Sequence, residues 1–300
     1  MTNIELIQEL RNITAAGMKD CKDALSQSNW DLESAIDLIK AKGLNIVSGR
    51  EGKIASEGIL ALESCQAYAA LVEVNSQTDF TAKSPEFHQL AKAAVGHYSQ
   101  CIVEKIPFDF NYEALKTMRD DLISKTKENI VIRRWWKQEA FTPQERVFTY
   151  LHSNNQIGVM LLLQANEASF LDDERFVKLG EDLSMQIAAM NPIAVSGNRL
   201  SNEQINRQRA IFQTQLKEEG KPEAMWDKIM IGKMNRFFKD SCLLEQESVL
   251  VPKSSVGQVV IDTAKAIGCH IAVVDFVRAQ VGSDIEKVNE NFADEVAKLV

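Results

Sequence analysis

The sequence predicts an α+β protein: a three-helix N-terminal bundle, two duplicated α+β subdomains with small antiparallel sheets, an inserted helical hairpin and a C-terminal helix. Three observations predict this class. Apolar residues recur at helical spacing near the N-terminus, strand-like hairpins alternate with helices after residue 58, and the order strand, phenylalanine, helix occurs at both Phe80 and Phe170. The predicted boundaries are 1–45 for the bundle, 46–57 for a linker, 58–140 and 141–280 for the subdomains, and 281–300 for the C-terminal helical module.

The composition indicates a globular protein and argues against nucleic acid as its primary partner. Of the 300 residues, 45% are hydrophobic, which is enough to build more than one buried core. The formal net charge of −8 and the isoelectric point near 5.2 argue against direct binding of nucleic acid, since phosphate contacts need a basic surface. A protein partner remains compatible with this charge.

The cysteines and the absence of apolar runs predict a cytoplasmic protein. The five cysteines are scattered and no pair has C-x-x-C spacing, so the sequence predicts reduced thiols and no zinc or redox site. The N-terminal residues MTNIE are acidic where a signal peptide would be basic. No apolar run approaches the roughly 18 residues that a membrane crossing needs, so we expect no membrane association.

The predicted bundle begins with a capping box, in which Thr2 and Glu5 precede an apolar face at helical spacing. A second short helix follows residues 14–17, and a third opens at Asp31 and is expected to stop at Gly43. Three short helices in this length resemble a ubiquitin-associated bundle. Because such a bundle is small, its exposed apolar positions predict a docking face.

The first subdomain is predicted to form a hairpin from residues 59–64 and 68–75, around a turn at 65–67. Ser84 and Pro85 then provide an N-cap and a first helical residue for the next helix. A further helix over about 112–129 and a third strand over 130–136 complete this subdomain.

The second subdomain repeats the order, with a predicted hairpin of residues 147–153 and 157–164 and a helix that follows Phe170. Its third strand is expected late, near 270–277. The intervening residues 198–240 predict an antiparallel, coiled-coil-like helical arm, because a capping box at Ser201 opens one helix and GKP at 220–222 turns the chain. The alternative is two ordinary core helices. An amphipathic helix is predicted over 285–299.

Sequence motifs for covalent chemistry or cofactor binding are missing. The chain contains no P-loop, dinucleotide-binding, zinc-protease or nucleophile-elbow motif. Its four histidines are far apart, and only His152 lies at a suggestive place, beside the turn of the second hairpin. The sequence therefore predicts no enzyme, no cofactor and no metal site.

The segment NSQTDF at residues 75–80 is the most informative one, because it joins a predicted strand to the helix that begins at Pro85. Residues on such connections are commonly presented by a rigid scaffold. Two interpretations remain open from these residues alone. Phe80 either closes the core under the helix, as aromatic residues usually do, or projects with Asp79 toward a partner.

Several segments, found in family order along nearly the whole chain, together resemble bacterial translation elongation factor Ts. They are TAAGMKDCKDAL at 14–25, EVNSQTDF at 73–80, ENIVIRR at 128–134, IGV at 157–159, GKP at 220–222 and LLEQ at 243–246. The sequence departs from the family pattern at Ser76, where cysteine is common, at Thr81, where valine is usual, and at SNNQ in 153–156.

The resemblance implies a guanine-nucleotide exchange factor that binds elongation factor Tu and promotes GDP release without covalent chemistry. It implies that Asp79 and Phe80, flanked by Thr78 and Thr81, intrude on the partner's G domain near its magnesium and phosphate site. His152 corresponds to a histidine that presses on the same region.

The resemblance also assigns the remaining parts. The bundle docks on the G domain near the nucleotide, with Met18 and Asp20 as the expected contacts. The second subdomain and the C-terminal helix reach the partner's other domains, and the arm is a dimer contact in some members. The alternative function is a non-catalytic adaptor whose ubiquitin-associated-like bundle tethers an interaction platform to another partner.

Overall fold

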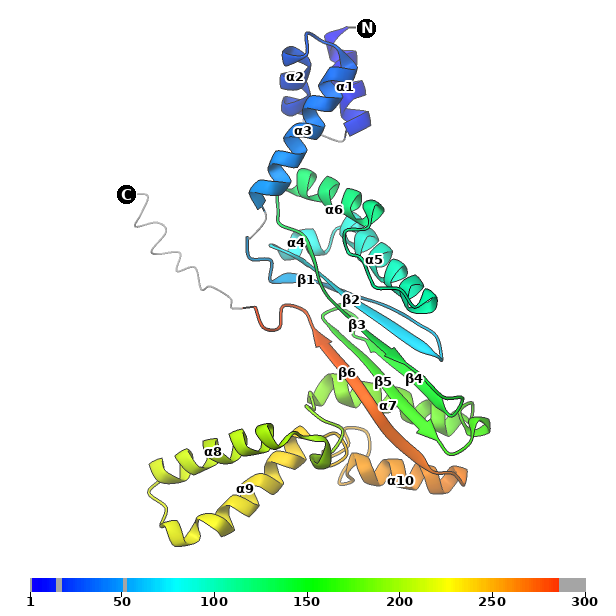
Figure 1. Ribbon diagram of the computed structural model, residues 1–300, viewed down its shortest axis with the longest axis vertical. Coiled ribbons are helices and arrows are strands. Elements are labelled where there is room, and N and C mark those ends of the chain that lie inside the picture. The colour runs from blue at the N-terminus through cyan, green and yellow to red at the C-terminus, as the bar shows by residue number, and fades with distance from the viewer. Residues whose placement is uncertain (1, 15–17, 51–52, 286–300) are drawn as a thin grey trace. The chain divides into compact units, whose positions relative to one another are not determined.

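The computed structural model describes residues 2–14, 18–50 and 53–285 (Figure 1). The chain divides into two compact units. The first comprises Met1–Ala61, Leu71–Trp135 and Gln280–Val300, and the second comprises Leu62–Ala70 and Trp136–Ala279. The helix predicted over 285–299 falls almost entirely outside the described residues.

The N-terminal bundle consists of α1 (Asn3–Thr14), α2 (Met18–Gln27) and α3 (Leu32–Arg50). The predicted capping box is present: the backbone N–H of Thr2 donates to Glu5 Oε2 at 2.7 Å, and that of Glu5 donates to Thr2 Oγ1 at 3.4 Å. A small core fills the space between the helices, formed by Leu10, Cys21, Ala24, Leu25 and Ala35.

Helix α3 does not stop at Gly43, as the sequence predicts, but continues to Arg50. The predicted linker over 46–57 is therefore helical in its first part. A single glycine inside a helix costs only about 1 kcal/mol relative to alanine, and no proline follows it. The glycine is thus too weak a signal to end the helix.

The first sheet contains β1 (Glu57–Ser64), β2 (Tyr68–Ser76) and β3 (Val131–Glu139) in the order β1-β2-β3. The short α4 (Asp79–Ala82), then α5 (Pro85–Glu104) and α6 (Glu113–Thr126), connect β2 to β3. Central strand β2 is almost entirely buried, in keeping with its nearly continuous apolar run. As predicted, Ser84 caps α5, its side chain accepting from the Phe87 N–H at 3.3 Å.

The second sheet has the same plan, with β4 (Glu145–Leu151), β5 (Ile157–Ala165) and β6 (Ile271–Gln280) in the order β4-β5-β6. Strands β4 and β5 are antiparallel, with a register from Glu145↔Gln164 to Leu151↔Gly158. Strand β6 confirms the predicted late third strand. The two three-stranded antiparallel sheets and the N-terminal helices confirm the predicted α+β class.

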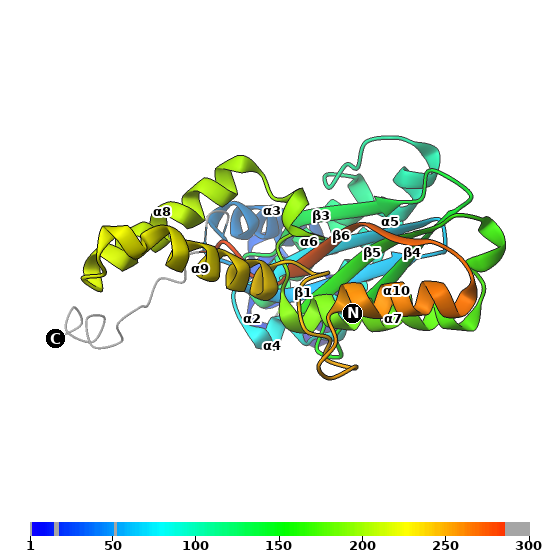
Figure 2. The ribbon, with the colours of Figure 1, turned by 90° about the horizontal axis from the view of Figure 1, so that it is seen from below.

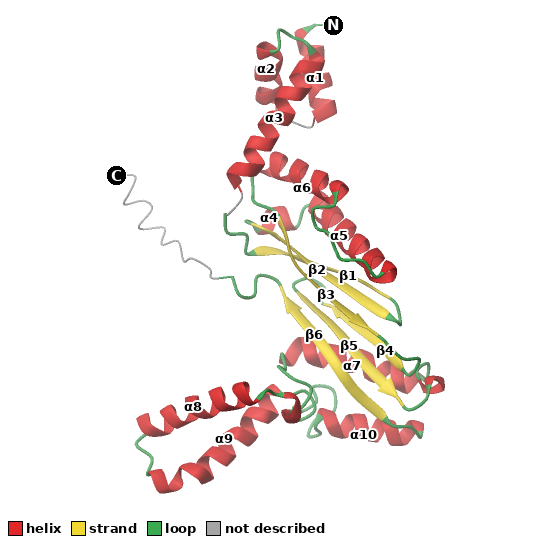
Figure 3. Ribbon diagram, viewed as in Figure 1, coloured by secondary structure: helices red, strands yellow, loops and turns green. Residues whose placement is uncertain are grey.

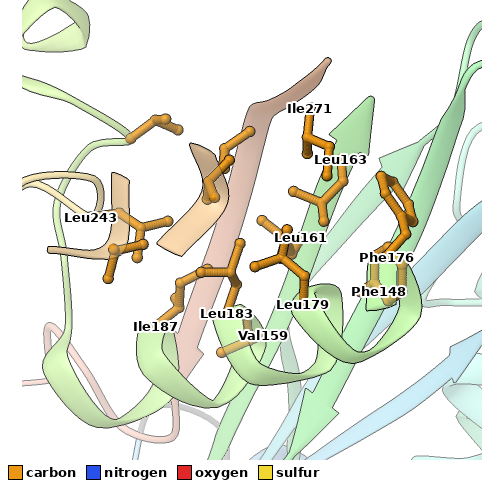
Figure 4. Close-up of a cluster of buried hydrophobic side chains, with 14 of the residues drawn as sticks. Phe148, Val159, Leu161, Leu163, Phe176, Leu179, Leu183, Ile187, Leu243 and Ile271 are labelled. Atoms are coloured by element: carbon orange, nitrogen blue, oxygen red, sulfur yellow. The ribbon is translucent and has the colours of Figure 1, made fainter. Parts of the chain in front are cut away.

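Two helices cover one face of the second sheet (Figure 2): α7 (Glu174–Met190) and α10 (Val256–Ile267). Their apolar faces and the strands enclose one core (Figure 4), in which Phe148, Leu161, Leu163, Phe176 and Ile187 are buried. The 3₁₀ turn η1 (Ala168–Phe170) places Phe170, partly buried, against this core. Sequence reasoning missed α10, although Ser255 caps its start and Gly268 ends it at φ +83°.

The predicted arm is confirmed as a helical hairpin (Figure 3) of α8 (Asn202–Glu218) and α9 (Trp226–Ser241), flanked by the 3₁₀ turns η2 (Gly197–Arg199) and η3 (Glu223–Met225). The capping box at Ser201 forms with Gln204. Within these described helices, the buried residues are Leu216 of α8 and Met234 of α9. Helices with so little buried surface are not core helices, so the alternative interpretation is wrong.

A buried amide pair links the base of the arm to α7. Gln246 donates through Nε2 to the carbonyls of Asp240 at 3.0 Å and Met190 at 3.3 Å. Its Oε1 accepts from Gln186 Nε2 at 3.3 Å, and both side chains are buried. Because buried polar groups must be paired, this network gives the LLEQ motif a structural role.

Replacing Gly180 by alanine is expected to destabilise the second unit by about 1–3 kcal/mol, the usual cost of overpacking a core. A Cβ on Gly180 would lie 2.4 Å from Cδ1 of the buried Phe148, which cannot move without disturbing the core. This clash outweighs the gain of about 1 kcal/mol in helix propensity.

Gly232→Ala is the matched control, since Gly232 also lies within a helix and a Cβ there meets nothing within 4 Å. We expect it to stabilise the protein by about 1 kcal/mol at most. Urea denaturation of both variants measures the difference. Equal free energies of unfolding for the two variants would contradict the predicted clash.

Candidate partner-binding site

The segment between β2 and α5 forms one helical turn, α4, rather than an irregular connection. Thr78 is its N-cap, with an extended backbone (φ −120°, ψ 155°) and a side chain that accepts from the Thr81 N–H at 3.3 Å. The Ser84 N–H donates to the Thr81 carbonyl at 3.0 Å and joins the turn to α5. The N-cap threonine and the acidic first residue explain why so short a helix forms here. We call residues 78–81 the tip.

Three residues of the tip are exposed: Thr78, Asp79 and Phe80. The side chain of Phe80 is 83% exposed, so the interpretation that it closes the core is wrong. Asp79 is also exposed and pairs through Oδ2 with Lys83 Nζ at 2.6 Å, one helical turn later. The hydrogen bond from Lys83 holds the pKa of Asp79 below its ordinary value, so the carboxylate is charged at neutral pH.

Thr81 is different, because it is only 7% exposed and lies with Ala82 on the buried side of the turn. The sequence expectation groups Thr81 with the partner-binding residues. Because it is buried, Thr81 has little surface available for contact with a partner, and it instead packs beneath the exposed residues of the turn. Helical geometry explains the split, since successive residues of one turn point in different directions.

Three residues that sequence reasoning missed contact this segment. Lys83 pairs with Asp79, and their i,i+4 spacing could have revealed it. Glu128 hydrogen-bonds Thr78, and the N–H of Asn129 donates to Gln77 Oε1 at 2.8 Å. Contacts across some fifty residues of chain leave no local pattern in a single sequence.

His152 lies in the second unit, at the end of β4, and its side chain is exposed. Its Nδ1 is 2.9 Å from the hydroxyl oxygen of Tyr150, which lies two residues earlier, on β4. The backbone N–H of His152 donates to the Ile157 carbonyl at 2.9 Å, and Asn155 turns the chain with φ +56°. The imidazole is therefore oriented by a tyrosine and presented at a tight hairpin turn.

On the bundle, the expected contacts Met18 and Asp20 both lie in the first turn of α2. Met18 is 60% exposed. Asp20 forms an ion pair with Lys42 of α3, whose hydrogen bond lowers the pKa of the carboxyl group. Exposed Ile4 and Ile13 on α1 add to the apolar surface of the bundle.

Across the described ranges, no three His, Cys, Asp or Glu side chains are grouped as a metal site requires. No helix in this part of the chain is long and apolar enough to cross a membrane. The arrangement that the site does offer is an exposed aromatic ring beside a charged carboxylate on a short, capped helix. Such a surface suits noncovalent recognition of another protein.

Comparison with known proteins finds two family models that match the chain, and full-length relatives. The family model described as elongation factor TS matches residues 77–283, and a UBA-like domain model matches residues 1–43. An elongation factor Ts of Clostridioides difficile (strain 630) is 36% identical, with 99% of each chain covered. One from a Nitratiruptor species is 37% identical, with 97% of this chain and 96% of the relative covered. One from Syntrophotalea carbinolica is 34% identical, with 98% and 97% covered.

Proposed function

The chain belongs to the elongation factor Ts family of nucleotide exchange factors for elongation factor Tu, and we propose that its tip performs the exchange step. Asp79 and Phe80 press on the G domain of elongation factor Tu and disturb its magnesium and phosphate site, which releases GDP. The single observation that supports this role is the 83% exposure of Phe80 on a capped turn.

The mechanism requires only differential binding. Tight binding of a nucleotide depends on the metal ion and on backbone amides that surround the phosphates. A factor that binds the distorted G domain lowers the affinity of that domain for the nucleotide. The nucleotide lowers the affinity for the factor by the same amount, because coupling between two ligands is reciprocal. Each tenfold loss of GDP affinity takes about 1.4 kcal/mol of such coupling.

The other predicted residues have supporting parts in this proposal. His152, held by Tyr150 at the β4–β5 turn, presses on the same region of the G domain. Met18 and Asp20 of the bundle dock near the nucleotide, and Thr81 supports the tip from its buried side. The second unit contacts the partner's other domains.

Stopped-flow release of fluorescent GDP from elongation factor Tu tests the function directly. An exchange factor raises the rate of GDP release, and this acceleration saturates as its concentration rises. A non-catalytic adaptor would bind elongation factor Tu and leave the release rate unchanged. That outcome, with binding confirmed by calorimetry, would refute the proposed function.

We also propose that the arm, residues 202–241, forms a dimer contact with the arm of a second copy of the chain. Supporting it, Ile211 of α8 and Ile231 of α9 are 44% and 65% exposed. We expect light scattering at rising concentration to approach twice the chain mass of 33.6 kDa. Ile231→Glu should restore the single mass, because a charge in an apolar contact is costly.

Gln213→Glu, at an exposed position of α8, is the matched control and should leave the mass of the dimer unchanged. If the unmodified chain keeps the mass of one copy at all concentrations, the arm does not pair on its own.

A further inference from the structure

We propose that Glu128 is the positioning residue of the exchange reaction, holding the tip in the conformation that presents Phe80. The inference rests on the proposed function of the tip. Glu128 lies between α6 and β3, some fifty residues beyond Thr78 in the chain. None of its atoms needs to touch the partner for this role.

Both carboxylate oxygens of Glu128 accept hydrogen bonds from one residue, Thr78. Oε1 accepts from the Thr78 hydroxyl at 2.7 Å, and Oε2 accepts from the Thr78 backbone N–H at 3.0 Å. These are charge-assisted hydrogen bonds, which are stronger than neutral ones. Together they hold both the backbone and the side chain of Thr78.

These two hydrogen bonds are important because Thr78 is the N-cap of α4. Its hydroxyl donates to Glu128 and accepts from the Thr81 N–H at 3.3 Å, so the carboxylate orients the capping oxygen. Helix α4 spans only Asp79–Ala82, and a helix of one turn is unstable on its own. The direction in which Phe80 projects therefore depends on the cap.

Glu128 is itself held rigidly by its neighbours. Lys127, in the left-handed conformation (φ +63°), ends α6, and its N–H donates to the Ile123 carbonyl at 2.8 Å. The buried Asn129 donates through Nδ2 to the Lys53 carbonyl at 2.6 Å and through its N–H to Gln77 at 2.8 Å. The chain on both sides of Glu128 is thus anchored, and the carboxylate has a fixed position from which to hold the tip.

The test compares Glu128→Ala with Glu104→Ala, a matched loss of a carboxylate at the far end of α5. At saturating exchange factor, we expect Glu128→Ala to slow GDP release from elongation factor Tu roughly tenfold, equivalent to about 1.4 kcal/mol. Glu104→Ala should keep the normal rate, and the two variants should melt at the same temperature. Glu128→Gln, which keeps one acceptor oxygen, should give an intermediate rate.

Two readouts separate positioning from general structure. Hydrogen exchange should be faster at the amides of Thr78 and Thr81 in Glu128→Ala, with the rest of the first unit unchanged. In the double variant Phe80→Ala/Glu128→Ala, release should be no slower than in Phe80→Ala alone, because residues that act through one another are not additive.

The contrary outcomes are distinct. A normal rate for Glu128→Ala, or a rate loss with unchanged amide protection, overturns the inference. The inference is also overturned if the double variant slows GDP release by the product of the two single-variant factors. If GDP release is slow with Phe80→Ala but normal with Glu128→Ala, only the proposed role of Glu128 is wrong. If Phe80→Ala itself keeps the normal rate, the proposed function of the tip fails, and the role of Glu128 fails with it.

Discussion

Replacing Phe80 by alanine is expected to slow the catalysed release of GDP roughly 30- to 700-fold, because a well-placed aromatic anchor contributes about 2–4 kcal/mol to an interface. The melting temperature should not change, since the ring is 83% exposed and supports no core. Stopped-flow fluorescence measures the rate, and a thermal melt of the same sample measures the stability.

Phe141→Ala is the matched control, because Phe141 is 80% exposed but lies on the loop before β4. It should leave both the rate and the melting temperature unchanged. A marked loss of stability in Phe80→Ala, with normal exchange per folded molecule, would show that the ring is structural and that the proposed role is wrong.

Replacing Glu73 by alanine is expected to reduce the free energy of unfolding by about 3–5 kcal/mol, the usual cost of removing one partner from a buried ion pair. Glu73 is fully buried in β2 and accepts from Arg134 Nε at 2.6 Å. It also accepts from the Gly282 N–H at 2.8 Å. The substitution removes the acceptor of the Gly282 N–H and one of the two carboxylates that pair with Arg134, the other being Asp284.

The effect should extend to the segment that follows β6. Arg134 also donates to the Gln280 carbonyl at 3.0 Å and to the Ser283 hydroxyl at 2.8 Å, so one cluster ties β2 and β3 to residues 280–284. Urea denaturation of Glu73→Ala measures the loss. Glu63→Ala, at an exposed position of β1, is the control and should stay within about 0.5 kcal/mol. A loss of similar size in both variants would contradict the importance of the cluster.

Elements with strong local signals could be predicted from the sequence. The capping box at Ser201 and the Ser84-Pro85 start predict helices that the structure confirms. The hairpins and the late third strand were also predictable, because strand runs and turn residues are local features. Two local signals were interpreted wrongly: Ser255 and Gly268 mark the ends of α10, which sequence reasoning missed, and the single Gly43 does not end α3.

The candidate site was predictable in its location but not in its construction. The segment around Asp79 could be singled out because it joins a strand to a capped helix. The hydrogen bonds between Glu128 and Thr78 could not be predicted from the sequence, since they join positions some fifty residues apart. Pairing over such a separation depends on how α6 and β3 pack, and no local pattern records it.

The sequence by itself determined the α+β class, the order of the elements and the lack of familiar catalytic motifs, since each follows from local periodicity and residue type. Only the tertiary structure decided which aromatic residues are exposed. Phe80 and Phe170 occupy corresponding places in the repeated order strand, phenylalanine, helix. Yet Phe170 packs against the core of its unit, whereas Phe80 projects into solvent. Burial depends on contacts from distant parts of the chain, so two similar local patterns can give a core residue and an exposed tip.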